Sequence, residues 1–206
     1  MLRETLFVAA AATMIAAAPA LAGSVTSTFD SDLEGWTGNG FSLQHIDSGG
    51  NPVGYLKGTD TTGNFGTIIA PSKFIGIALL DGGMLSFDFI GLVPNNVLTG
   101  FGEVTISGGG LSSSLDITDL QPNSTWQTAS TVLSAAIWGE SQSDWTTIIS
   151  DVSAITIEIE SINGFDEMNG IDNVSVDIAM APVPLPGAGA LLLAGLGGFA
   201  YLRRRA

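Results

Sequence analysis

Residues 155–160 read ITIEIE, with an apolar residue at every second position. The same alternation recurs in three further runs, LSFDF at 85–89, EVTIS at 103–107 and VSVDI at 174–178. A period of two is typical of β-strands that bury one face and expose the other to water. Turn-forming residues separate the runs, at 49–51, 81–83, 108–110 and 163–164.

Six more short segments fit strands: Val25–Phe29, Phe41–Ile46, Gly54–Lys57, Thr67–Ala70, Leu111–Ile117 and Trp126–Val132. One segment, Ser143–Ser150, begins with residues suited to cap a helix and predicts a single helical turn. About ten short strands predict an all-β fold, an antiparallel β-sandwich of two sheets.

The composition excludes several classes of function. The chain has 206 residues, 20 acidic and 6 basic side chains, a net charge of −14, no cysteine and one histidine. It therefore lacks disulfides and thiolate metal ligands, and it has no basic face to bind nucleic acid. Between residues 23 and 182, two lysines against 19 acidic residues leave a charge of −17. Such a surface attracts divalent cations, although adaptation to a saline medium explains the charge equally well.

The first 22 residues resemble a secretory signal peptide. Arg3 precedes an uncharged run at 5–18, and the small residues of Ala20-Leu21-Ala22 follow. This pattern predicts export and cleavage between Ala22 and Gly23, with a buried N-terminal helix as the alternative. We therefore expect three parts: a signal peptide at 1–22, a sandwich domain at 23–180 and a C-terminal segment at 181–206.

The C-terminal segment predicts a short membrane helix. Residues 187–202 are 16 uncharged residues, about 24 Å of helix, which is slightly short for a bilayer core. Arg203, Arg204 and Arg205 follow directly. Positive charge beside an apolar run stays on the cytoplasmic side, so the domain is predicted to lie outside an inner membrane.

This C-terminal segment resembles the PEP-CTERM sorting signals, in particular the VPLPA-CTERM subgroup. The motif is Val183-Pro184-Leu185-Pro186, and Gly187 takes the place of the final alanine. The resemblance implies an exosortase-type processing enzyme as a partner and a membrane attachment that is transient. Two prolines hold the segment extended, as a processing site requires, although they also suit a simple helix stop.

The domain itself resembles the laminin B (laminin IV type A) domain. The matching stretches, in order, are Phe29-Asp30 with Gly35-Trp36, Tyr55, 70–76 (APSKFIG), 82–87 (GGMLSF), 104–108 (VTISG), Trp126 and 171–176 (IDNVSV). Ile77 departs from the family, in which an acidic residue is common at that position. The resemblance implies a galactose-binding-like jelly roll and an adhesive or carbohydrate-recognising module.

The resemblance also implies a structural calcium ion near the meeting point of the first and last strands. Asp30 and Asp172 would supply carboxylate oxygens, with Asp32 as a third ligand, and calcium prefers such oxygens. The alternative is that Asp30 caps a turn and Asp172 pairs with a backbone amide.

Among the four tryptophans, Trp138 and Trp145 lie between strands in polar surroundings and are the candidates for a ligand face. Trp36 and Trp126 are expected to be buried. His45 lies in an alternating run and is expected to be an ordinary strand residue.

We therefore expect a non-enzymatic module of the cell surface or extracellular matrix, which binds a polysaccharide or a surface protein. The alternative is a secreted hydrolase of matrix glycans, which would need two facing carboxylates that the sequence does not single out.

Overall fold

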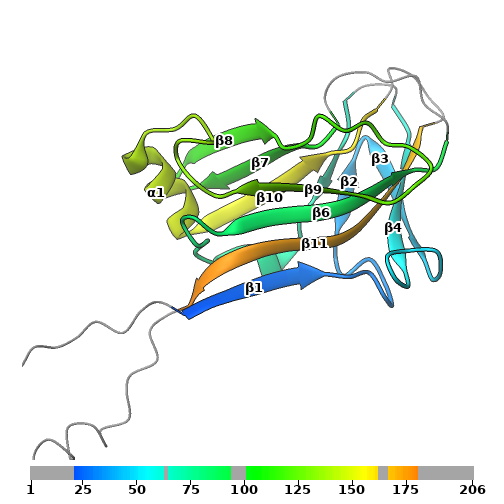
Figure 1. Cartoon of the computed structure of the whole chain (residues 1–206), viewed down its shortest axis with the longest axis horizontal. Helices are drawn as coiled ribbons and strands as arrows, with labels where there is room; N and C mark the ends of the chain where they lie inside the picture. Colours follow the sequence, from blue (N-terminus) through cyan, green and yellow to red (C-terminus); the bar gives the residue numbers. More distant parts are fainter. Residues whose placement is uncertain (1–20, 63–64, 94–100, 162–166, 181–206) are drawn as a thin grey trace, which may run out of the picture. The chain divides into compact units, whose positions relative to one another are not determined.

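The computed structural model describes residues 21–62, 65–93, 101–161 and 167–180 (Figure 1). Ala22–Met180 form one compact unit. Most of the predicted signal peptide and all of the predicted sorting segment lie outside the described residues. Within the described ranges, no helix combines the length and the hydrophobicity needed to cross a membrane.

The described residues form two antiparallel sheets, as the sequence predicted. Sheet A has the order β3-β4-β11-β6-β9, with β1 also paired to β11. Its strands are β1 Leu21–Ser27, β3 Phe41–Ile46, β4 Tyr55–Asp60, β6 Met84–Gly91, β9 Gln127–Val132 and β11 Met168–Met180. Sheet B has the order β2-β5-β10-β7-β8. Its strands are β2 Thr37–Asn39, β5 Thr67–Ile69, β7 Glu103–Gly108, β8 Leu111–Asp116 and β10 Val152–Glu158.

The alternating runs bury the faces that their periodicity indicates. In β10, Ile155 and Ile157 are buried, whereas Thr156 and Glu158 are half-buried. The same alternation places Val104 and Ile106 of β7 in the core. The core lies between the sheets, and burial of these apolar side chains is the main force that holds the sandwich together.

The helix is longer than predicted. Helix α1 spans Gln142–Ser150, nine residues, and Ser141 caps it by accepting a hydrogen bond from the Asp144 amide at 3.1 Å. The apolar side of α1 packs against β7 and β8. This packing stabilises a helix longer than the single turn that the sequence predicted. Strand β2 was not predicted, because its three residues are all exposed and show no alternation. A short 3-10 helix, η1, spans Ser72–Phe74.

Candidate ligand-binding face

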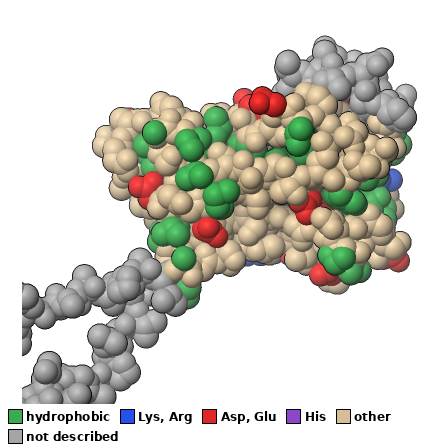
Figure 2. Space-filling view, in the orientation of Figure 1, with side chains coloured by type: hydrophobic (Ala, Val, Ile, Leu, Met, Phe, Trp, Pro, Cys, Tyr) green, Lys and Arg blue, Asp and Glu red, His purple; other side chains and the backbone are tan. Residues whose placement is uncertain are grey.

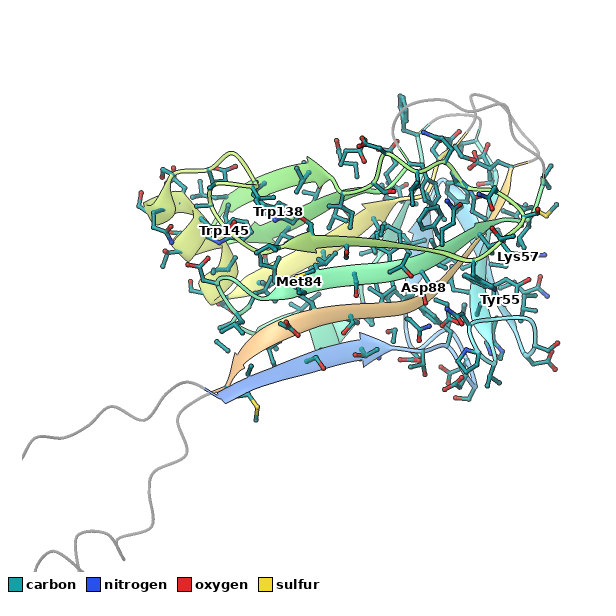
Figure 3. All side chains as sticks on the ribbon, viewed as in Figure 1. Tyr55, Lys57, Met84, Asp88, Trp138 and Trp145 are labelled. Atoms are coloured by element: carbon teal, nitrogen blue, oxygen red, sulfur yellow. The ribbon has the colours of Figure 1, made fainter. Side chains whose placement is uncertain are left out.

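The prediction that Trp138 and Trp145 form a ligand face was wrong. Trp138 is only 4% exposed and Trp145 is 0% exposed. Their rings pack together with centroids 5.3 Å apart, and the Trp145 Nε1 donates to Asp81 Oδ1 at 3.1 Å (Figure 3). Because α1 lies on sheet B, Trp145 faces the core while the polar residues near it face solvent. Trp36, by contrast, is buried as predicted.

A different aromatic pair reaches the surface. Trp126 was expected to be buried, but it is only half-buried. Its ring meets the half-buried ring of Tyr55 edge to face, with centroids 5.5 Å apart and an interplanar angle of 78°. The Trp126 Nε1 donates to the carbonyl oxygen of Gly49 at 3.0 Å. We call Tyr55 and Trp126 the aromatic pair.

The register of sheet A explains how the aromatic pair forms. In β4, Leu56 is buried, so Tyr55 lies on the opposite, outward face of the sheet. Gly170 in the neighbouring strand β11 leaves room for the Tyr55 ring. A Cβ atom at Gly170 would lie 3.0 Å from Tyr55 Cδ2 and 2.6 Å from Ile90 Cγ2. The glycine therefore lets the tyrosine ring cross β11 towards Trp126, and burial raises the pKa of the Tyr55 phenol.

Polar side chains lie beside the aromatic pair on the same face. The sheet register pairs Asp88 of β6 with Asp172 of β11 and with Thr128 of β9. Asp88 Oδ1 accepts a hydrogen bond from Thr128 Oγ1 at 2.5 Å, and Asp88 Oδ2 accepts from Asn51 Nδ2 at 2.9 Å and Asn173 Nδ2 at 2.8 Å. These bonds fasten the loop between β3 and β4 to the sheet beside the aromatic pair.

Asp172 is held in the same way. It is 1% exposed, and its carboxylate accepts the backbone amides of Asn51 and Asn173, each at 2.7 Å. Its pKa is raised to about 6, chiefly by burial and also by the neighbouring Asp88 and Asp30, although the two amides act to lower it. This pairing with backbone amides is the alternative that the sequence left open.

The other predicted calcium ligands are exposed and have local partners. Asp30 accepts a hydrogen bond from Thr28 Oγ1 at 2.8 Å, and Asp32 accepts one from the Glu34 amide at 2.6 Å. In the described part of the chain, no three Asp, Glu or His side chains gather as a metal ion would require. Asp30, Asp32 and Asp172 are thus not arranged as a preformed set of metal ligands, and calcium binding at these residues stays a prediction.

The rest of the face is a row of small hydroxyl side chains. Ser86 pairs with Ser175 on one side and with Ser130 on the other, and Thr26 Oγ1 lies 3.0 Å from Ser175 Oγ. Figure 2 shows a surface on which acidic and hydrophobic side chains are scattered among backbone atoms and other side chains. Lys57, next to Tyr55 on the outward face of β4, is a cation close to the aromatic pair (Figure 3).

Other predicted residues have simple placements. His45 lies in β3 as predicted, with Nε2 at 2.9 Å from the carbonyl oxygen of Phe29. Ala22 and Gly23 lie in β1, where the predicted cleavage between them stays a prediction. The predicted sorting residues, Val183 to Gly187 and Arg203 to Arg205, lie outside the described residues. The alternation of β4 could have identified Tyr55 as a residue of the outward face. Tyr55 directly precedes the buried Leu56, and successive side chains of a strand point to opposite faces.

Comparisons with known proteins agree with the fold. No family model matches the sequence, and no curated protein matches it significantly. The chain is similar to the L4b domain of human laminin alpha-2, with a TM-score of 0.59 and 13% identity over 77% of this chain and 98% of that domain. It is also similar to the CBM22-1 xylan-binding domain from Paenibacillus barcinonensis, with a TM-score of 0.52 and 12% identity over 77% of this chain and 95% of that domain.

A third similar structure is an exo-beta-agarase, with a TM-score of 0.52 and 14% identity over 75% of this chain. The match covers only 24% of that enzyme. The described domain therefore has the two-sheet fold shared by a laminin L4 domain and a carbohydrate-binding module.

Proposed function

We propose that this chain is an exported, non-catalytic module that binds a polysaccharide on the outward face of sheet A. The observation that carries the proposal is the half-exposed aromatic pair, Tyr55 and Trp126, held edge to face on that sheet. A sugar ring presents an apolar face of C–H groups and a rim of hydroxyls. An aromatic surface beside small polar side chains is suited to both parts of such a ligand.

The neighbouring hydrogen-bonding groups fit this role. Thr128 and Asn51 are exposed beside the aromatic pair, and their contacts with Asp88 fix their side chains. Groups that are already ordered lose little conformational entropy when a ligand binds. The fold supports the proposal, since a xylan-binding domain and a laminin domain have similar structures.

The same contacts argue against hydrolysis at this face. A glycosidase needs one carboxyl group to protonate the leaving oxygen and a second to act as base or nucleophile. Asp88 and Asp172 are 7% and 1% exposed, and both accept hydrogen bonds from side chains or amides of the protein itself. Their role is therefore to position the loop and the amide groups around the ligand.

Binding is tested with the purified chain and a panel of insoluble and soluble polysaccharides, by pull-down and affinity electrophoresis. Trp126→Ala and Tyr55→Ala should each weaken binding about tenfold or more, as for other central aromatic contacts. Phe65→Ala is the matched control, because Phe65 is an aromatic residue with 75% exposure that lies outside the aromatic pair. Equal binding by all three variants, or release of reducing ends by the wild type, would contradict the proposal.

The delivery of the module is a separate part of the proposal and rests on the sequence. We infer that the signal peptide directs export, that the tail anchors the chain briefly in the inner membrane, and that an exosortase-type enzyme processes it. Replacing Pro184 and Pro186 by alanine should make the unprocessed form accumulate. Mass spectrometry of the mature C-terminus gives the direct test, and Arg203–Arg205 still present in envelope fractions would contradict processing.

A further inference from the structure

One lysine of this acidic domain has a positive charge that no described carboxylate balances. Between residues 23 and 182 the only lysines are Lys57 and Lys73, against 19 acidic residues. Lys73 forms an ion pair with Glu34 and donates to the carbonyl oxygen of Thr26 at 2.7 Å. Lys57 forms no ion pair and no side-chain hydrogen bond with any described residue. The folded chain therefore uses the charge of Lys73 but not that of Lys57.

Lys57 lies beside the aromatic pair on the outward face of sheet A. It follows Tyr55 by two positions in β4, so the two side chains leave the same face of the strand roughly 7 Å apart. The register pairs Lys57 with Gly170 of β11, the glycine over which the Tyr55 ring lies. Figure 3 shows Lys57 and Tyr55 towards one end of the sandwich, with Trp138 and Trp145 towards the other. The ammonium group is therefore within reach of a ligand that contacts the aromatic pair.

The neighbours of Lys57 in the sheet are neutral. Its partner in β3 is Gln44, which is exposed, and its partner in β11 is Gly170, which has no side chain. Tyr55 and Thr59 lie two positions to either side in β4 and share its face, and neither is charged at neutral pH. An ammonium group among neutral neighbours attracts an anion more strongly than one that a carboxylate already balances.

The negative charge of the domain does not prevent such a contact. Asp88 and Asp172, the carboxylates beside the aromatic pair, are 7% and 1% exposed. Both oxygens of each accept hydrogen bonds from the protein, and these donors offset part of their charge. Exposed charges farther away than the Debye length, about 8 Å at physiological ionic strength, are largely screened. An anionic group in direct contact with Lys57 is therefore attracted more than the distant carboxylates repel it.

We propose that Lys57 selects an acidic polysaccharide, one whose sugar rings carry carboxylate or sulfate groups. This inference rests on the function proposed above and names the chemical class of its ligand. The aromatic pair contacts the apolar face of one sugar ring, and the Lys57 ammonium donates to an anionic oxygen beside that ring. Lysine carries three donors on a flexible stem, so it suits either kind of anionic group.

The test compares acidic polysaccharides with their own neutral derivatives. Sodium polygalacturonate is paired with its carboxyl-reduced form, and sodium kappa-carrageenan with its chemically desulfated form. Calorimetric titration of the purified full chain should show about tenfold tighter binding to at least one acidic form than to its neutral derivative, as expected for one hydrogen bond to a charged group. The pair that shows the preference tells whether a carboxylate or a sulfate is bound.

Variants of Lys57 and of its strand partner isolate the effect of the charge. Lys57→Gln should lose the preference for the acidic form and should bind the neutral form within about twofold of the wild type, whereas Lys57→Arg should keep the preference. Gln44→Glu should also reduce the preference, because it places a carboxylate opposite Lys57. Ser112→Asp is the matched control. It changes the net charge by the same amount at an exposed position of β8 in sheet B, so the preference should not change.

Salt concentration and stability give independent readouts. The preference should shrink as sodium chloride is raised from about 0.05 M to about 1 M, because the Debye length falls to about 3 Å. The melting temperature, Tm, of each variant should stay within about 3 °C of the wild-type value, since these substitutions are on the surface.

The outcomes separate this inference from the proposed function. If the wild type binds the neutral derivatives as tightly as both acidic forms, or if Lys57→Gln weakens both forms equally, the inference is overturned and the proposed function stands. If the wild type binds none of these four polysaccharides and none of the wider panel, both are overturned.

Discussion

Replacing two tryptophans one at a time should separate the core from the binding face. Trp145 is fully buried against Trp138 and donates a hydrogen bond to Asp81. Trp126 is half-buried and contacts Tyr55. Trp145→Ala should therefore reduce stability strongly, whereas Trp126→Ala should reduce stability less and ligand binding strongly.

The structure sets the size of each effect. Removal of a fully buried indole costs about 3–5 kcal/mol, which corresponds to a fall in Tm of roughly 10 °C. At Trp126, the edge-to-face contact contributes about 0.5–1.5 kcal/mol and the bond to the Gly49 carbonyl about 1 kcal/mol. We therefore expect Trp126→Ala to cost about 2 kcal/mol.

Urea unfolding monitored by far-ultraviolet circular dichroism measures both costs, and the polysaccharide pull-down measures binding. Trp145→Phe is the control that keeps a large apolar ring in the core and should cost less than Trp145→Ala. If the two alanine variants lose equal stability, or if Trp145→Ala alone loses ligand binding while remaining stable, the assignment of these tryptophans is refuted.

Three further predictions concern the sheet, the first loop and pH. Gly170→Ala should weaken ligand binding about as much as loss of one aromatic ring, because its Cβ would displace the aromatic pair; unchanged affinity in the pull-down would contradict this. Glu34→Gln should cost about 1–3 kcal/mol in urea unfolding, because it breaks the ion pair with Lys73; a cost below 0.5 kcal/mol, on the order of an exposed pair, would show that the contact is unimportant. Lowering the pH from about 7.5 to about 5, with a metal chelator present, should raise Tm. The pKa values of Glu158 and Glu160 are raised from 4.5 to about 7 in the folded chain. Between those pH values the folded chain therefore binds more protons than the unfolded chain, so its stability increases as the pH falls. A Tm that falls over this range would contradict the burial of these carboxylates.

Much of the fold was predictable because strand periodicity is a local property. The four alternating runs became β6, β7, β10 and β11, with their apolar residues in the core. Turn residues marked the ends of these strands, so a two-sheet sandwich followed from the pattern. Strand β2 escaped prediction because its exposed residues carry no periodic signal.

The candidate sites were much less predictable. The sequence placed Trp126 in the core and Trp138 and Trp145 on the surface, whereas in the structure Trp126 is only half-buried and the other two tryptophans are buried. In the ITIEIE run, alternation predicts that Glu160 faces solvent, yet it is 5% exposed. Its exposure depends on what covers the end of β10, and the periodicity of β10 carries no information about those neighbours.

The sequence by itself determined the strand content, the two-layer architecture and the strongly acidic charge of the domain, because each depends on composition or on neighbouring residues. The tertiary structure alone decided which of those residues meet. Tyr55 reaches Trp126 only because the register of sheet A puts Gly170 beneath its ring. Asp60 and Glu167 become neighbours only when β4 pairs with β11. Such contacts join residues far apart in the chain, and their geometry is fixed by sheet pairing and core packing rather than by any local pattern.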